Sequence, residues 1–100
     1  MAINVGALND LQPGNMMSIE ANDNEILIAN VDGTIYAVGN TCTHMGCSLS
    51  EGTLKGNTVE CPCHSALFDL QTGKVLQGSA TAPIPVYKVI LENGQISVDV

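Results

Sequence analysis

All four cysteines and both histidines of this 100-residue chain lie between positions 42 and 64. They occupy two short stretches, "CTHMGC" at residues 42–47 and "CPCH" at residues 61–64. Thiolates and imidazoles are the side chains that bind zinc and iron in proteins, and two thiols can also form a disulfide. The two stretches therefore indicate a metal centre, a disulfide, or both.

The spacing inside the two stretches pairs one cysteine with one histidine in each. The first reads C-x-H and the second C-x-x-H, so the candidate ligands are Cys42, His44, Cys61 and His64. Two loops with these spacings can each direct one thiolate and one imidazole toward a common site. Such a set suits a [2Fe–2S] cluster in which one iron takes both thiolates and the other takes both imidazoles.

Other chemistries of cysteine and histidine fit the spacing less well. Structural zinc sites usually have ligands separated as C-x₂₋₄-C, which the C-x-H pair does not match. A c-type haem needs C-x-x-C-H, whereas this chain has C-x-C-H. A nucleophilic Cys–His enzyme would leave three cysteines without a role. A structural zinc module stays as an alternative, and we do not expect an enzyme.

The charge of the chain limits the class of partner. The formal net charge is −7, with only three basic residues, Lys55, Lys74 and Lys88. Three lysines cannot follow a phosphate backbone, so we exclude nucleic acid and anionic membrane surfaces as partners. The acidity either steers the chain toward a positive patch on a partner protein or only keeps it soluble.

The N-terminal sequence "MAINVGALNDLQPGN" has no basic start, arginine pair or long apolar run. It therefore does not resemble a secretory signal. The longest apolar stretches are too short to span a bilayer. The sequence predicts a soluble cytoplasmic protein without membrane insertion, with an extracytoplasmic location as the alternative.

The hydrophobic pattern alternates with period 2 and is interrupted by turn signals, which predicts an all-β fold. Strands are expected at 25–31 and 34–38 around "DG", and at 86–92 and 95–100 around "NG". Further strands are expected near the N-terminus, at 3–8 and 16–21. Residues 40–83 hold all the cysteines and histidines, with short strands expected at 58–61, 66–70 and 74–76.

The two motifs closely resemble those of the Rieske protein family, and weaker similarity extends over most of the chain. The resemblance implies one Rieske domain over residues 1–100, with an antiparallel β-sandwich or partial-barrel base at 1–39 and 84–100. A small cluster-binding subdomain at about 40–83 is inserted into this base. The resemblance also implies one [2Fe–2S] cluster per chain, bound by the four candidate ligands.

Further residues take roles from the same resemblance. It implies a disulfide between Cys47 and Cys63. By restricting the unfolded chain, the loop that this bond closes would stabilise the fold by roughly 3 kcal/mol. The residues expected around the cluster are Met45, Gly46, Ser65, Ala66, Phe68 and Pro83. High-potential relatives have a serine and a tyrosine where this chain has Ala66 and Phe68, which cannot donate side-chain hydrogen bonds. A potential in the lower or middle part of the Rieske range is therefore expected.

The resemblance predicts a soluble Rieske-type ferredoxin that carries single electrons. Its expected partners are a reductase and a terminal oxidoreductase, which dock at the tip formed by His44 and His64. The alternative is a Rieske subunit of a larger oxidoreductase, such as a nitrite-reductase-type small subunit, an oxygenase component or part of a quinol-oxidising complex. Ferredoxins of aromatic-ring dioxygenases generally lack the extra cysteine pair, so this chain departs from them there.

Overall fold

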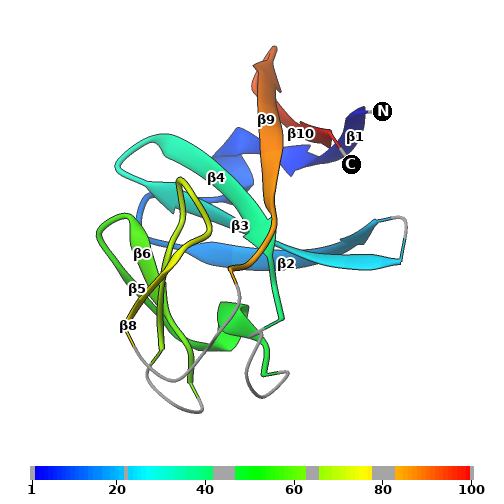
Figure 1. The fold of residues 1–100 in the computed structure, drawn as a ribbon. Coiled ribbons are helices and arrows are strands. Elements are labelled where there is room, and N and C mark those ends of the chain that lie inside the picture. The colour runs from blue at the N-terminus through cyan, green and yellow to red at the C-terminus, as the bar shows by residue number, and fades with distance from the viewer. Residues whose placement is uncertain (1, 22, 42–46, 63–65, 78–82, 100) are drawn as a thin grey trace.

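The computed structural model describes residues 2–21, 23–41, 47–62, 66–77 and 83–99. Two antiparallel sheets make up most of this part of the chain (Figure 1). The larger sheet contains β1 (Ala2–Ala7), β2 (Met16–Ala21), β3 (Asn24–Val31), β4 (Thr34–Gly39), β9 (Val86–Glu92) and β10 (Gln95–Asp99). The smaller contains β5 (Thr53–Lys55), β6 (Thr58–Glu60), β7 (Leu67–Asp69) and β8 (Val75–Gln77). This confirms the predicted all-β fold.

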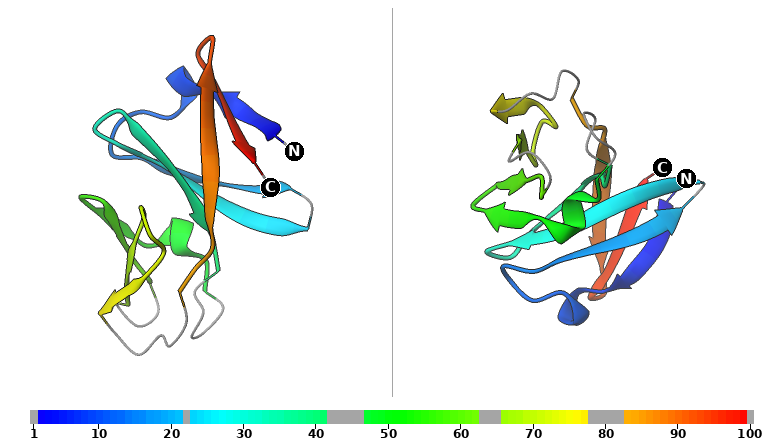
Figure 2. Two further views of the ribbon diagram at one scale, coloured as in Figure 1. Left: turned by 45° about the horizontal axis from the view of Figure 1, so that its top comes forward. Right: turned by 90° about the horizontal axis from the view of Figure 1, so that it is seen from below.

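The larger sheet has the strand order β1-β10-β9-β4-β3-β2 and curls on itself (Figure 2). Its two predicted hairpins have the backbone that their turn residues favour. Asp32 and Gly33 have φ of 51° and 93°, and Asn93 and Gly94 have φ of 52° and 73°. Positive φ at both central residues is typical of type I′ turns, whose twist matches that of the paired strands.

The smaller sheet lies in the chain between β4 and β9. Its strand order is β5-β6-β7-β8, and it lies beside the β3–β4 hairpin (Figures 1 and 2). Two short 3₁₀ helices, η1 (Leu8–Asp10) and η2 (Leu49–Glu51), complete the described elements. Within the described ranges, no helix has the length and apolar character needed to cross a membrane. The boundaries assigned to base and insert stay a prediction.

Strand β3 is buried on both faces and separates two hydrophobic cores. Ile26 and Ile28 pack inside the curled sheet with Ile96 and Val98 of β10. Leu27 and Ala29 point to the opposite face and join a second cluster, which we call the insert core. Its buried members are Leu27, Ala29, Val38, Leu49, Val59, Cys61, Ala66, Phe68, Leu70 and Ile84. The period-2 alternation of one strand thus attaches the insert to the base.

Candidate metal centre

The first cysteine–histidine stretch lies in a loop whose two ends are paired. Thr41 and Ser48 form an isolated antiparallel bridge, with residues 42–47 between them. Directly before the bridge, the backbone carbonyl of Asn40 accepts a hydrogen bond of 2.7 Å from the Leu49 N–H. The loop therefore begins and ends at one place, next to the end of β4.

The second stretch forms the connection of the β6–β7 hairpin. The pairing of Glu60 with Leu67 closes the ladder, and the Cys61 N–H then donates to the Ala66 carbonyl over 2.8 Å. Residues 62–65 form the remaining connection of four residues.

Cys61 is the one predicted ligand that lies within the described residues, and its thiol is free and buried, with 1% of its surface exposed. It belongs to the insert core, together with Ala66 and Phe68. Cys47, at the end of the first loop, packs against the same core and is not a free thiol. The structure therefore brings the described ends of both loops onto one apolar cluster.

The other predicted ligands, Cys42, His44 and His64, lie outside the described residues, as do Met45, Gly46, Cys63 and Ser65. Among the residues that are described, no group of three or more histidine, cysteine, aspartate or glutamate side chains is arranged to hold a metal ion. The ligand set, Cys61 included, therefore stays a prediction.

The donor chemistry around Cys61 nevertheless fits an iron–sulfur cluster. A buried thiolate among apolar side chains is the environment in which such clusters are shielded from water. Ala66 and Phe68 are both fully buried, and their place around a cluster stays a prediction. Pro83 is exposed, and its neighbour Ile84 is the residue of that segment that enters the insert core.

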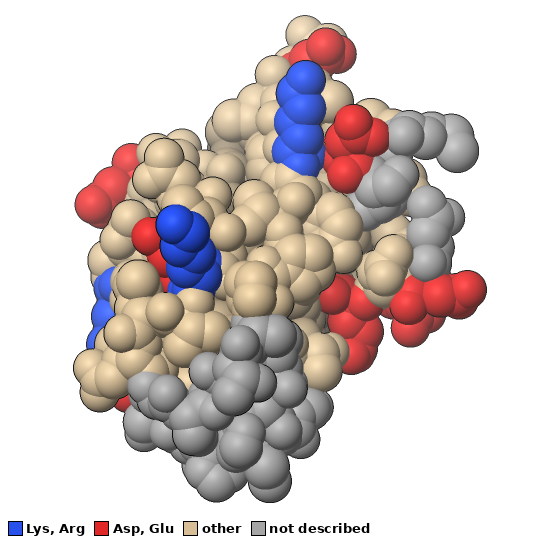
Figure 3. All heavy atoms as spheres, in the orientation of Figure 1, with Lys and Arg blue, Asp and Glu red and all other residues tan. Residues whose placement is uncertain are grey.

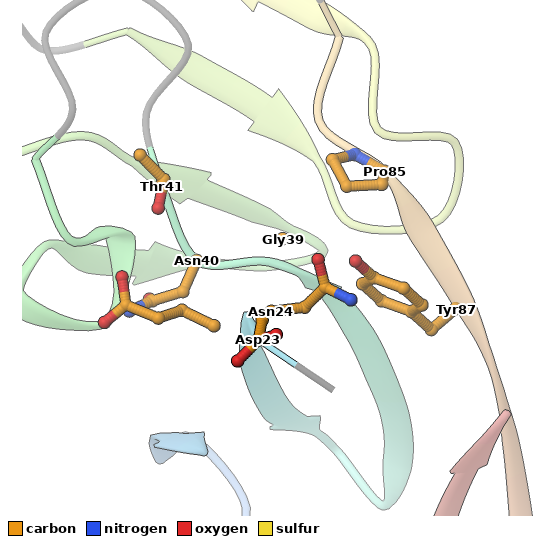
Figure 4. A pocket seen from close by; sticks show the side chains of 8 residues that line it. Asp23, Asn24, Gly39, Asn40, Thr41, Pro85 and Tyr87 are labelled. Atoms are coloured by element: carbon orange, nitrogen blue, oxygen red, sulfur yellow. The ribbon is translucent and has the colours of Figure 1, made fainter. Parts of the chain in front are cut away.

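A recess lies where the first loop leaves the base. It has a volume of about 260 Å³ and is lined by Asp23, Asn24, Glu25, Gly39, Asn40, Thr41, Pro85 and Tyr87. The side chains of Asn24 and Tyr87 point toward each other across it (Figure 4). Sequence reasoning missed this recess because its lining comes from three separate segments, none of which carries a motif.

Carboxylates gather at the same end of the β2–β3 hairpin. Glu20 and Glu25 are direct cross-strand partners, and Asp23 lies in the turn between them. Like charges directly opposite each other destabilise a sheet. On the face shown in Figure 3, the carboxylates at this hairpin lie apart from the lysines. Lys55 is instead paired with Glu60, with 3.3 Å between Nζ and Oε2. The hairpin end is therefore a locally negative surface beside the first loop.

Comparison with known proteins identifies close relatives. The family model of the Rieske [2Fe–2S] domain matches residues 1–88. The ferredoxin component of the naphthalene 1,2-dioxygenase/salicylate 5-hydroxylase systems of Ralstonia sp. is 38% identical over 94 residues, which is 94% of this chain and 90% of that protein.

Two solved structures share the fold over nearly the full chain. One is the complex of reduced oxygenase and oxidized ferredoxin in carbazole 1,9a-dioxygenase, with a TM-score of 0.93 and 35% identity over 97% of this chain and 91% of the matched chain. The other is a putative NADH-dependent nitrite reductase small subunit from Mycobacterium tuberculosis, with a TM-score of 0.88 and 25% identity over 98% of this chain and 93% of that chain.

Proposed function

Since the chain belongs to the Rieske [2Fe–2S] family, carries that cluster and is an electron-transfer protein rather than an enzyme, we propose that it serves an oxygenase system. In this role it takes single electrons from a reductase and passes them to a terminal oxygenase. Relatives that are ferredoxin components of dioxygenase systems match it over nearly its whole length, which supports this role. The extra cysteine pair does not prevent that similarity.

The proposed ligands are Cys42 and Cys61 on one iron and His44 and His64 on the other. The single observation that carries this assignment is the free, buried thiol of Cys61 in the core that also receives the first loop. When bound, the cluster accepts and releases one electron. The chain contributes two loops whose described ends are tied by backbone pairing.

We also propose a disulfide between Cys47 and Cys63, which would join the two loops. Cys47 is not a free thiol, and Cys61, the other described cysteine, is free and so is not its partner. The proposed location is the cytoplasm. Partial burial of Cys47 against the insert core would slow reduction of the bond there.

A stopped-flow experiment tests the proposed role. The reduced protein is mixed with the oxidised terminal oxygenase of the Ralstonia naphthalene dioxygenase system, and its reoxidation is followed by visible absorbance. We expect single-exponential reoxidation whose rate rises with oxygenase concentration. The large subunit of an NADH-dependent nitrite reductase serves as the competing acceptor. Reoxidation by that subunit alone would favour the role of a nitrite-reductase-type small subunit, which the structural similarity also allows.

The midpoint potential is predicted to rise when hydroxyl donors are restored beside Cys61. In Ala66→Ser and Phe68→Tyr, a hydroxyl that donates to a cluster sulfur stabilises the reduced, more negative state. About 1–2 kcal/mol per hydrogen bond corresponds to about 40–90 mV for one electron. Protein-film voltammetry measures the shift. As the control, Tyr36→Phe removes a hydroxyl at the rim of the same core and should leave the potential unchanged. A wild-type midpoint near the top of the Rieske range, or no rise in either variant, would contradict this account.

Docking is proposed at the tip that carries His44 and His64, with the negative end of the β2–β3 hairpin orienting a positively charged partner. Neutralising Asp23 and Glu25 together (Asp23→Asn with Glu25→Gln) should slow association with the oxygenase about threefold to tenfold at low ionic strength. The difference should vanish in high salt, because salt screens exposed charges. Stopped-flow rates across a salt series provide the measurement.

The matched control is Asp32→Asn with Glu92→Gln. It also removes one aspartate and one glutamate charge, but from the other two hairpins of the larger sheet. Asp32, like Asp23, has a positive φ that asparagine tolerates. Glu92 ends β9 at a turn that points away from the smaller sheet (Figure 1). Equal slowing by both double variants would mean that only the total charge matters, and the orienting role of the hairpin would be lost.

A further inference from the structure

Asn40 directly follows β4 and is one of the two buried polar residues among those described, with 2% of its surface exposed. It takes part in three hydrogen bonds. Its backbone N–H donates to the Glu25 carbonyl over 3.0 Å, and its backbone carbonyl accepts from the Leu49 N–H over 2.7 Å. Its side-chain Oδ1 accepts from the Ser50 N–H over 2.8 Å.

These hydrogen bonds connect the base to both ends of the first loop. Asn40 immediately precedes the Thr41–Ser48 bridge, and the two donors on η2, Leu49 and Ser50, immediately follow it. The third bond holds Asn40 to the start of β3. One residue thus fixes where residues 41–48 leave the base and where they return to it.

The residue before Asn40 makes this junction tight. The Gly39 N–H donates to the Pro85 carbonyl over 2.9 Å. A Cβ atom on Gly39 would lie only 2.8 Å from Cγ and Cδ of Pro85. Pro85, which precedes β9, therefore packs closely against β4 one residue before the Asn40 contacts. The backbone of Asn40 is therefore held in place by the base. We expect a change at its side chain to alter mainly the position of η2 and of the loop before it.

We propose that Asn40 is a positioning residue for the cluster: its side-chain amide holds η2 against the end of β4 and so sets the geometry in which the first loop presents Cys42 and His44. This rests on the proposed ligand assignment. The Oδ1 atom accepts the hydrogen bond of the Ser50 N–H, which would otherwise have no partner at this junction. Removing the Asn40 side chain therefore weakens the junction. Without this side chain, η2 is held to the end of β4 only by the Leu49 N–H to Asn40 carbonyl bond and the Thr41–Ser48 bridge.

Asn30 provides a matched control, because it is the other buried asparagine and has the same chemistry in the base. It is 3% exposed, its Nδ2 donates to the Leu11 carbonyl and its Oδ1 accepts from the Gly33 N–H, both over 2.8 Å. These side-chain contacts reach the residue after η1 and the β3–β4 turn, and neither partner belongs to a cluster loop. Asn30→Ala should therefore reduce stability without changing the metal centre.

The experiment compares Asn40→Ala with Asn30→Ala in the full chain with its cluster. Thermal unfolding should occur at a lower temperature in both. At an ambient potential equal to the wild-type midpoint, the ratio of oxidised to reduced protein should change at least threefold in Asn40→Ala. This corresponds to a shift of the midpoint potential of about 28 mV, by the relation of 59 mV per tenfold for one electron. The electron paramagnetic resonance (EPR) line shape should change as well, and iron release to a chelator should be at least five times faster. Asn30→Ala should keep the wild-type ratio, line shape and release rate.

A conservative variant separates positioning from bulk. Asn40→Asp keeps an oxygen that can accept the Ser50 N–H, so its line shape and release rate should stay within twofold of wild type. Its potential is not compared, because the added negative charge itself changes the potential. If Asn40→Ala does not fold, Asn40→Ser takes its place, because the serine hydroxyl is too short to reach Ser50. We then expect the same changes in ratio, line shape and release rate for Asn40→Ser.

The proposal is overturned if Asn40→Ala, or Asn40→Ser in its place, loses stability but keeps the wild-type ratio, line shape and release rate. A wild-type protein without any iron–sulfur signal would instead refute the proposed function, so the two failures are distinguishable.

Discussion

Cys61→Ala is expected to give a folded but colourless protein with less than a tenth of the wild-type iron and sulfide. Alanine cannot bind iron, and the buried position leaves no water-filled space for a substitute ligand. The neighbours of Cys61 in the insert core are apolar, so the side chain of alanine fits there without an unsatisfied polar group. Iron and acid-labile sulfide analysis, with visible circular dichroism, measures the loss.

Cys47→Ala is the control for that loss. Cys47 packs against the same core, but it is assigned to the disulfide and not to the cluster. We expect this variant to keep its iron and sulfide and to lose up to about 3 kcal/mol of stability, the chain-entropy contribution of a loop of this length. Full cluster content in Cys61→Ala would show that the proposed ligand set is wrong.

Gly73→Ala is expected to destabilise the protein by about 3 kcal/mol or more, from backbone strain and overpacking together. Gly73 lies in the β7–β8 turn with φ of 77°, and a Cβ atom there would lie 2.1 Å from the Ile84 carbonyl oxygen. The same two residues are hydrogen-bonded, because the Ile84 N–H donates to the Gly73 carbonyl over 2.9 Å. Added bulk would thus separate the smaller sheet from the segment that leads into β9. Urea unfolding measures the effect.

Gly56→Ala isolates the contribution of the clash. Gly56 lies in the β5–β6 turn of the same sheet with φ of 58°, and a Cβ atom on it would have no neighbour within 4 Å. It should therefore cost only the backbone strain, about 1 kcal/mol. If Gly73→Ala were no worse than Gly56→Ala, the close packing of the turn on Ile84 would contribute nothing to stability.

The strands that could be predicted from the sequence are those that carry a long alternating pattern and a strong turn. The "DG" and "NG" pairs indicated the β3–β4 and β9–β10 hairpins, because both turns need positive φ at two successive residues. In contrast, β5 and η2 were not predicted. Each has only three residues, which is too short for a period to be recognised.

The kind of metal site could be predicted from the sequence, but the residues that hold its loops in position could not. The spacing of cysteine and histidine is a local feature that the sequence shows directly, and the structure adds that Cys61 is buried in the insert core. The contributions of Asn40 and Ile84 depend on contacts with segments ten or more residues away, such as Ser50 and Gly73. No pattern in a single sequence records such pairings, so these residues were found only in the structure.

The most direct test of the central claim is pulsed EPR of the reduced protein after labelling its histidines with ¹⁵N. The chain has only two histidines, so every labelled imidazole belongs to a proposed ligand. We predict hyperfine coupling of the unpaired electron to two ¹⁵N nuclei from two imidazoles on one iron. A cluster signal without ¹⁵N coupling, or coupling to a single imidazole, would contradict the assignment of His44 and His64.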